Sequence, residues 1–358
     1  MKYLVKLVVV MFAAVLSLGA ISTASADKLK VGFIYIGPPG DHGWTYAHDQ
    51  GRLMLEEQLG DQVETTFVEG VPEGPDAERT IAKLAETGHK LIFTTSFGYM
   101  EPTLKAAKRF PDVKFEHATG YQQADNVATY SARFYEGRYV QGQIAAKMSK
   151  SGVIGYIASF PIPEVVRGIN AFMLGAQSVN PDMKVKVVWV YTWFDPPKEA
   201  DAAKVLMDQG ADMITQHTDS TAAIQAAADR GVLAFGQASD MIHFAPDTQL
   251  TANMNTWGPY YVARTQAVLD GTWTSGDTWH GMGHGMVVMA PFTNMPDSVR
   301  QMATETTAAL TSGKLHAFTG PIHNQAGELV VPAGETADDG MLAGMNFYVK
   351  GVDDKLPE

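Results

Sequence analysis

The chain has 358 residues, of which 46% are hydrophobic, carries a formal net charge of −12 and contains no cysteine. An acidic chain is poorly matched to nucleic acid or to an anionic membrane surface, so neither is expected as a partner. The length exceeds that of one ordinary hydrophobic core and suits two lobes, which must be stable without disulfides.

The first 26 residues have the three parts of a secretory signal peptide. Two lysines within residues 1–6 give a charged start, residues 7–18 form an apolar core, and Ala24-Ser25-Ala26 fits the cleavage pattern. An apolar core of this length is too short to span a bilayer comfortably. The sequence therefore predicts cleavage after Ala26 and a free periplasmic protein. Without a cysteine, the mature N-terminus cannot be a lipoprotein anchor.

The first expected strand, loop and helix of the mature chain define a candidate site. Residues 30–36 form an apolar run typical of a strand buried on both faces, and the Gly/Pro loop 37–40 ends it. A helical pattern occupies residues 45–59, with Trp44 just before it. Ligands of open parallel sheets bind outside the carboxyl ends of the strands, so Trp44 is a candidate contact. The alternative is a surface cap over the first helix.

Strands and helices then alternate almost without interruption. The pattern starts again at Gly152, so the second half repeats the first in architecture. This alternation predicts parallel sheets with helices on both faces. The expected strands are 63–68, 91–95, 114–118, 126–131, 152–157, 184–191, 213–216, 233–236, 250–255 and 286–289, and the expected helices are 76–86, 102–110, 135–148, 164–179, 198–209, 220–229, 258–269 and 296–312.

The predicted fold class is α/β, with two doubly wound parallel-sheet lobes joined by a hinge and a cleft between them. The first lobe is assigned residues 27–128 and 256–283, and the second lobe residues 129–255 and 284–358. The last hundred residues are less regular, and we expect returning segments there to tie the lobes together by more than one crossover.

Aromatic residues in loops at strand ends form the most informative set. Trp44 and Phe97 come from the first half and Trp193 from the second, while Asp240 follows a strand of the second half. Aromatic faces can stack a flat ring, and a carboxylate accepts hydrogen bonds from ring or hydroxyl donors. Surface packing is the alternative for each residue alone. Their shared placement at strand ends favours one joint site.

Catalytic and metal-binding patterns are missing from the sequence. His280 and His284 stand four apart, but three glycines surround them and no carboxylate pair is near, which favours a flexible loop over a metal site. There is no strand–GxSxG–helix elbow, no cysteine nucleophile, and no GxGxxG or Walker sequence after a strand. We therefore expect no enzyme activity, no cofactor and no metal.

Several stretches in order resemble the basic-membrane-protein (BMP) family of substrate-binding proteins, the receptors of purine nucleoside ABC importers. The likeness runs from about Lys30 to Gly320. The matching stretches are residues 40–44 (GDHGW), 96–100 (SFGYM), 110–115 (FPDVKF), 133–137 (RFYEG), 155–176 and 239–240 (SD). The resemblance implies a type I periplasmic binding protein whose lobes close on the ligand.

Carried over position by position, the family's two base-stacking aromatics fall on Trp44 and Trp193, and its cleft aspartate falls on Asp240. The resemblance thus implies a purine held between the two tryptophans. The expected ligand-binding set also includes His42, Phe97, Gly98 and Tyr99, which lie in the matching stretches, and Asn255, which stands where the family usually has a lysine.

Two departures from the family pattern bear on the ligand. The family usually has an aspartate after the strand at Phe115, where this chain has Ala118-Thr119, and a lysine where this chain has Asn255. Both positions help to hold the sugar in nucleoside-binding relatives. The change to neutral residues points to a ligand with less sugar. A free purine base such as adenine is therefore the first expectation, and a purine nucleoside the second.

The resemblance also implies partners: a small-molecule ligand and an inner-membrane ABC permease, with the receptor itself a monomer. The main alternative is a type I receptor for a sugar, including one linked to chemotaxis, because tryptophans also stack on pyranose faces and the fold is shared. An exported hydrolase acting on nucleosides is a further alternative, but it would need a catalytic carboxylate cluster or nucleophile motif that the sequence lacks.

Overall fold

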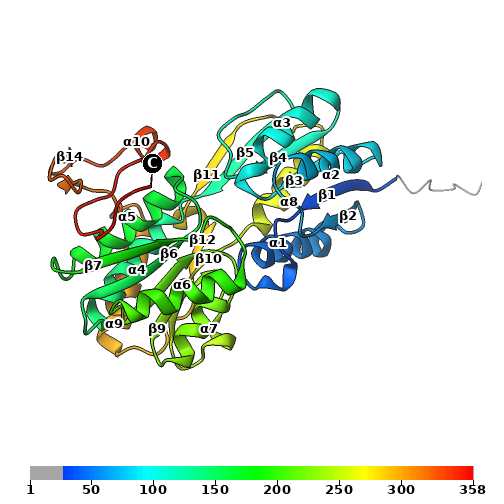
Figure 1. Cartoon of the computed structure of the whole chain (residues 1–358). Coiled ribbons are helices and arrows are strands. Elements are labelled where there is room, and N and C mark those ends of the chain that lie inside the picture. The colour runs from blue at the N-terminus through cyan, green and yellow to red at the C-terminus, as the bar shows by residue number, and fades with distance from the viewer. Residues whose placement is uncertain (1–26, 358) are drawn as a thin grey trace, which may run out of the picture.

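The computed structural model describes residues 27–357, which form two lobes, each built on a six-stranded sheet (Figure 1). The first sheet has the strand order β11-β5-β4-β3-β1-β2, and every neighbouring pair in it is parallel. Its strands are β1 (Leu29–Ile34), β2 (Val63–Val68), β3 (Leu91–Thr94), β4 (Lys114–Ala118), β5 (Val127–Ala132) and β11 (Asp277–His280).

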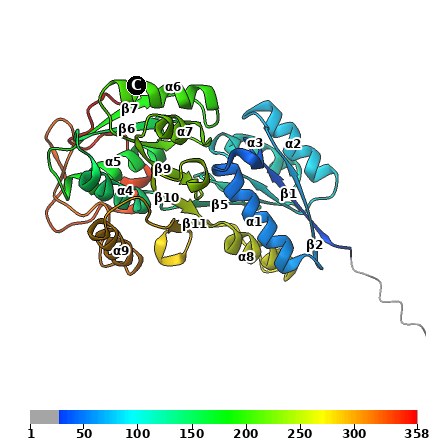
Figure 2. The same cartoon turned by 90° about the horizontal axis from the view of Figure 1, so that it is seen from below.

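Helices cover both faces of the first sheet, with α1 and α8 packed together on one face and α2 and α3 on the other (Figure 2). Successive side chains of β1 therefore enter two different cores: Phe33 lies in the core under α1, and Ile34 in the core under α2 and α3. The helices are α1 (Trp44–Leu59), α2 (Pro75–Glu86), α3 (Met100–Arg109) and α8 (Gly258–Leu269).

The second sheet repeats this plan in the order β12-β10-β9-β8-β6-β7, with only the edge strand β12 antiparallel to its neighbour. Helices α4, α5 and α9 lie on one face, and α6 and α7 on the other. The elements are β6 (Val153–Ala158), β7 (Lys184–Trp189), β8 (Met213–His217), β9 (Leu233–Ala238), β10 (Gln249–Asn255), β12 (Val287–Met289), α4 (Tyr135–Met148), α5 (Pro163–Gln177), α6 (Pro196–Asp208), α7 (Ala222–Asp229) and α9 (Asp297–Thr311).

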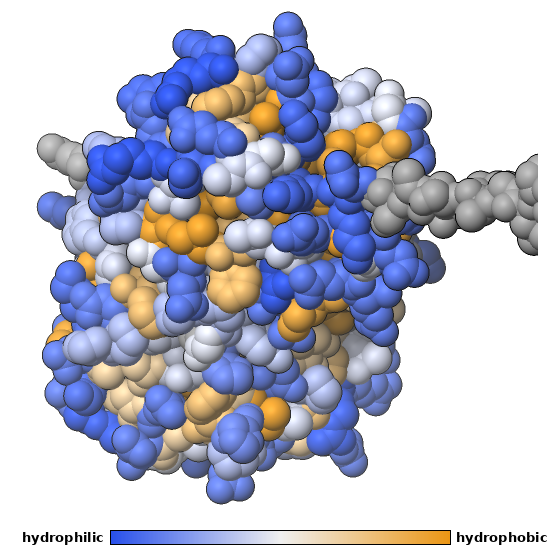
Figure 3. Space-filling model, turned by 90° about the vertical axis from the view of Figure 1, so that its right-hand side faces the viewer, coloured by the Kyte–Doolittle hydropathy of each residue, from blue (hydrophilic) through white to orange (hydrophobic). Residues whose placement is uncertain are grey.

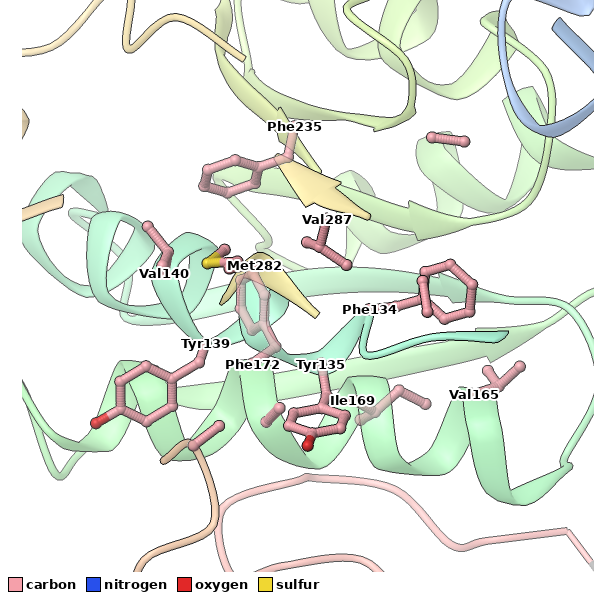
Figure 4. Packing of buried hydrophobic residues seen from close by; sticks show 14 of the residues in the cluster. Phe134, Tyr135, Tyr139, Val140, Val165, Ile169, Phe172, Phe235, Met282 and Val287 are labelled. Carbon is pink, nitrogen blue, oxygen red and sulfur yellow. The ribbon is translucent and has the colours of Figure 1, made fainter. Parts of the chain in front are cut away.

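Helices α4 and α5 pack unusually close because each has a glycine at the contact. A Cβ on Gly142 would lie 1.9 Å from the carbonyl oxygen of Phe172, and a Cβ on Gly175 would lie 2.1 Å from that of Tyr139. Any larger residue at either glycine would force the two backbones apart. The side chains of both helices, among them Tyr139 and Phe172, fill the core below the second sheet (Figure 4).

Within residues 27–357 the chain passes between the lobes three times: between β5 and α4, between β10 and α8, and between β11 and β12. The expectation of several crossovers therefore agrees with the fold. The expected boundary after residue 128 does not, because it cuts β5, which pairs with β4 and β11 as far as Ala132. The first lobe thus continues to Ala132. The expected boundary falls inside the expected strand 126–131, because periodicity does not show which lobe a strand joins.

The C-terminal part of the chain packs back onto the second lobe. The side-chain amide of Asn170 on α5 donates to the carbonyl of Phe347 at 2.7 Å and accepts from the amide of Val349 at 3.0 Å. Arg133, at the first crossover, forms two 2.7 Å hydrogen bonds with the carboxylate of Asp339. The segment contains β13 (Ile322–His323), β14 (Leu329–Val331) and α10 (Asp339–Ala343).

Short 3₁₀ turns complete the fold: η1 (Pro39–Asp41), η2 (Phe97–Tyr99), η3 (Ile242–Phe244) and η4 (Met282–His284). The predicted signal peptide, residues 1–26, lies outside the described residues. Among the helices of residues 27–357, none has both the length and the apolar character needed to cross a membrane. On the face drawn in Figure 3, hydrophobic residues form several small patches separated by hydrophilic side chains.

Candidate ligand site between the lobes

An inner cavity of about 20 Å³ lies between the lobes. The residues around it follow the carboxyl ends of strands in both sheets, as expected for open parallel sheets. The first lobe contributes Ile36, Trp44, Ser96, Phe97 and Thr119, and the second contributes Glu164, Trp193, His217 and Asp219. The structure therefore brings three of the expected contacts, Trp44, Phe97 and Trp193, to one cavity.

Trp44 is the first residue of α1 and only 8% exposed. Its indole Nε1 donates to the backbone oxygen of Thr95 at 2.6 Å, within the same lobe. The ring meets His48, Phe134 and Trp257 edge-on, with centroid distances of 4.4, 5.9 and 5.5 Å. These contacts fix the ring as a wall of the cavity and as part of the core behind it.

Trp193 lies in the loop between β7 and α6 and is half-buried. Its ring packs at 5.1 Å from Phe160 and 6.2 Å from His217, both in its own lobe. Its Nε1 donates across the cleft to Oε1 of Glu73 in the first lobe at 3.2 Å. The orientation of this ring thus depends on a contact between the lobes.

Glu73 was not among the expected site residues. It lies in the loop after β2, so the rule that loops after parallel strands form the site could have suggested it. Its Oε1 also accepts from the hydroxyl of Ser96 at 2.7 Å and the amide of Gly98 at 2.9 Å. A Cβ at Gly98 would lie 2.3 Å from the carboxyl carbon of Glu73, so only glycine allows this approach. Gly98 thus supports the site through Glu73.

His42 lies where the two lobes touch. Its ring stacks on Tyr46 at 4.9 Å and meets Phe244 of the second lobe edge-on at 4.8 Å. The hydroxyl of Ser239 donates to the backbone oxygen of His42. Next to it, a Cβ on Gly43 would lie 2.0 Å from the carbonyl oxygen of Asp219. His42 therefore contributes to the contact between the lobes, outside the set that lines the inner cavity.

Three other expected site residues also lie outside the cavity lining. The carboxylate of Asp240 accepts from the amide of Ile242 at 3.1 Å and from Nε2 of Gln249 at 2.6 Å, so it is used within its own segment. Tyr99 is fully buried and donates to a backbone oxygen. Asn255, at the end of β10, is 7% exposed, and its amide atoms have no hydrogen-bond partner among the described residues.

Glu164 and His217 form a polar pair that sequence reasoning missed. Glu164 is the second residue of α5, and its Oε1 lies 3.5 Å from Nε2 of His217 at the end of β8. Burial lowers the pKa of His217, which keeps its imidazole neutral at neutral pH. The expected helix began at Glu164, but the sequence alone gave no sign that this side chain faces the cleft.

An outer chamber of about 480 Å³ adjoins the inner cavity and shares Phe97, Thr119 and Glu164 with it. The guanidinium of Arg167 stacks over the ring of Trp279 at 4.7 Å in its wall, and burial lowers the pKa of Arg167 to about 10. The remaining lining residues are Gly120, Tyr121, Gln123, Ser131, Ile162, Pro163, Asp277 and Ala343.

The histidines of the third crossover show no metal-binding arrangement. The rings of His280 and His284 stack in parallel at a centroid distance of 4.1 Å. Among residues 27–357, no group of three or more His, Cys, Asp or Glu side chains could hold a metal ion.

The sequence profile of the family described as "ABC transporter substrate-binding protein PnrA-like" matches residues 28–314. The chain belongs to this family. The resemblance to the BMP family is thereby confirmed, and the chain is a substrate-binding protein of an ABC transporter rather than an enzyme. Such proteins bind their solutes outside the cytoplasm.

Two curated relatives cover almost the whole chain. A purine-binding protein of Brucella abortus is 71% identical over 332 residues, which are 93% of this chain and 95% of the relative. A protein of Haloferax volcanii with the name "Putative ABC transporter glucose-binding protein TsgA13" is 36% identical, over 93% of this chain and 83% of the relative. These two names describe different ligand classes.

Solved structures agree on the fold. An ABC transporter solute-binding protein from Aeropyrum pernix superposes with a TM-score of 0.70 at 19% identity, covering 88% of this chain and 95% of that one. A second, from Conexibacter woesei, gives 0.63 at 22% identity and covers 80% of this chain and 98% of that one. At this level of identity the likeness concerns the fold alone. The predicted type I binding-protein architecture is confirmed.

Proposed function

We propose that this protein binds a purine base between Trp44 and Trp193 and delivers it to an inner-membrane ABC permease. The observation that carries the proposal is the placement of two tryptophans from opposite lobes on one cavity, each with its N–H engaged elsewhere. Their polar edges are therefore satisfied, and their apolar faces are left for a flat ring. The 71% identical purine-binding relative points to the same ligand class.

Lobe closure explains how such a narrow site takes up a ring. The inner cavity of about 20 Å³ has room for roughly one water molecule, so a bicyclic ring must enter with the lobes apart. The three crossovers are natural hinge positions. Stacking on each tryptophan contributes about 1–3 kcal/mol, as measured for bases on aromatic side chains.

A free base such as adenine remains our first choice and a purine nucleoside the second. The neutral Thr119 lines the cavity, and Asn255 is buried away from it, so neither supplies a charge for sugar hydroxyls. The outer chamber of about 480 Å³ is nevertheless large enough for a pentose and supports keeping the nucleoside as second candidate.

A glucose-type sugar is the second candidate function, because the Haloferax relative is named for glucose. Tryptophan faces also stack on pyranose rings. Against it stands the higher identity of the purine-binding relative, 71% compared with 36% for the Haloferax protein. We further propose that the protein is a monomer. Its signal peptide is cleaved after Ala26, and the mature protein is free in the periplasm.

The test is to identify the ligand that travels with the protein and then to titrate it. Mass spectrometry of material released from purified, denatured protein should find a purine. Calorimetry on ligand-free protein should show tight binding of adenine and weaker or no binding of glucose. A released hexose, or glucose binding without purine binding, would contradict the proposal. N-terminal sequencing of the periplasmic fraction should begin at Asp27.

A further inference from the structure

The carboxylate of Glu164 lies at the junction of the inner cavity and the outer chamber and lines both. Its side chain is only 12% exposed. The one polar contact found for it among the described residues is the 3.5 Å approach of His217 to Oε1. An ionised carboxylate offers about four acceptor positions, and burying them without donors is unfavourable. A ligand that donates a hydrogen bond to the carboxylate of Glu164 would therefore remove this unfavourable contribution.

The groups around Glu164 leave the inner cavity richer in acceptors than in donors. The indole N–H groups of Trp44 and Trp193 are already used, and the hydroxyl of Ser96 donates to Glu73. Thr119 supplies one hydroxyl, which can donate or accept.

The two neighbouring candidate cations leave most acceptor positions of Glu164 without a hydrogen-bond donor. His217 is neutral at neutral pH because burial lowers its pKa, and its Nδ1 is buried without a partner in the described part of the chain. Arg167, three residues further along α5, donates to the carbonyl of Leu342 and stacks on Trp279. The charge of Glu164 acts on Arg167 through space and opposes the lowering of its pKa by burial, but no hydrogen bond between the two side chains is found among the described residues.

We infer that Glu164 is the specificity-determining residue of the cleft and selects a heterocycle whose edge donates hydrogen bonds. This rests on the proposed function and narrows it from purines in general to aminopurines. Adenine can donate to such an acceptor from its exocyclic NH₂. Hypoxanthine places a carbonyl oxygen where adenine has the amino group, so two sets of lone pairs would face each other.

The expected size of this preference follows from the chemistry of the lost bond. A hydrogen bond to a charged group contributes enough for about a tenfold to hundredfold change in affinity. Wild-type protein should therefore bind adenine at least tenfold more tightly than hypoxanthine. In Glu164→Gln the amide can donate to a carbonyl, so the adenine-to-hypoxanthine ratio should fall at least tenfold. Glu164→Asp, which keeps the charge but withdraws it, should give an intermediate ratio.

Calorimetric titration of the full mature chain with adenine and hypoxanthine tests this. Asp212→Asn is the matched control, because its carboxylate also lies in the second lobe but accepts from Ser149, Lys150 and Ser151 outside both cavities, and the ratio should stay at the wild-type value. Urea unfolding of each variant checks that the fold is kept. If a variant does not fold, the ratio of the wild-type affinities for adenine and hypoxanthine still tests the inference.

The possible results distinguish a failure of the role of Glu164 from a failure of the proposed purine binding. Equal wild-type affinity for both bases, or an equal loss for both in Glu164→Gln, would overturn the role of Glu164 and leave purine binding standing. Binding of neither base by wild type would overturn both this inference and the proposed function.

Discussion

The two tryptophans at the cleft are attached to the protein in different ways. Trp44 begins a helix, belongs to the buried core of its lobe and donates to a backbone oxygen of that same lobe. Trp193 lies in a loop, is half-buried and donates to Glu73 of the opposite lobe. One wall of the site is thus fixed by folding, whereas the other is completed only when the lobes meet. Substitutions should separate these two roles.

The largest effect is expected for Trp44→Ala. The change removes a buried ring that packs on His48, Phe134 and Trp257, so the free energy of unfolding should fall by about 3–5 kcal/mol. Urea unfolding followed by fluorescence measures it. Trp44→Phe keeps most of the ring and should recover more than half of the loss. A loss no greater than that of Trp193→Ala would remove the distinction between the two walls.

Trp193→Ala should instead act on binding. Losing one stacking face weakens binding of a purine about tenfold to a hundredfold, while the free energy of unfolding changes by no more than about 1 kcal/mol, because the ring is half-buried in a loop. Calorimetry with adenine measures the affinity, and the same urea unfolding measures the free energy of unfolding. Unchanged adenine affinity in this variant would rule out stacking on Trp193.

Acid should destabilise the lobe behind Trp44. His117 is fully buried, and burial lowers its pKa to about 4, while the unfolded chain has a histidine pKa near 6.5. Below pH 6.5 the unfolded state therefore binds a proton that the folded state does not. Stability is present above that pH and is lost as the pH falls toward 4, by about 2 kcal/mol between pH 7.5 and pH 5 for this residue.

Burial also lowers the pKa of His48 behind Trp44 and of His217 beside Trp193, so the total acid sensitivity should exceed that of His117 alone. Urea unfolding at the two pH values measures the difference. His117→Gln should show a smaller dependence on pH than wild type. A stability that is constant between pH 7.5 and pH 5 would contradict the neutral state of these histidines.

The smallest effect is expected for Glu73→Gln, which keeps the shape of the contact with Trp193 but removes its charge. Because the bond is partly exposed, we expect adenine affinity to fall about threefold to tenfold, through faster dissociation. Trp193→Phe removes the N–H that donates to Glu73 and is the partner for a double-mutant cycle. If the effects of the two substitutions on the free energy of adenine binding are simply additive, the hydrogen bond between Trp193 and Glu73 does not stabilise the closed state.

Sequence reasoning found the residues whose position follows from the strand ends. Trp44, Phe97 and Trp193 reach one cavity because the carboxyl ends of parallel strands face the cleft from both lobes. It did not find Glu73 and Glu164, since each is a single carboxylate in a segment with no distinctive pattern. Asp240 satisfied the same strand-end rule, yet its carboxylate is used by neighbouring donors. Position along the chain does not reveal which local partners a side chain meets.

By itself the sequence determined the two-lobed α/β fold, the resemblance to its family and the aromatic character of the site. Those features depend on hydrophobic period, turn residues and ordered motifs, which are local properties of the chain. Only the tertiary structure decided that β5 belongs wholly to the first lobe and that Glu73 reaches Trp193. It also decided that Glu164 faces the cleft beside His217. Hydrogen bonds between residues far apart in sequence depend on how the lobes meet, and no local pattern encodes that geometry.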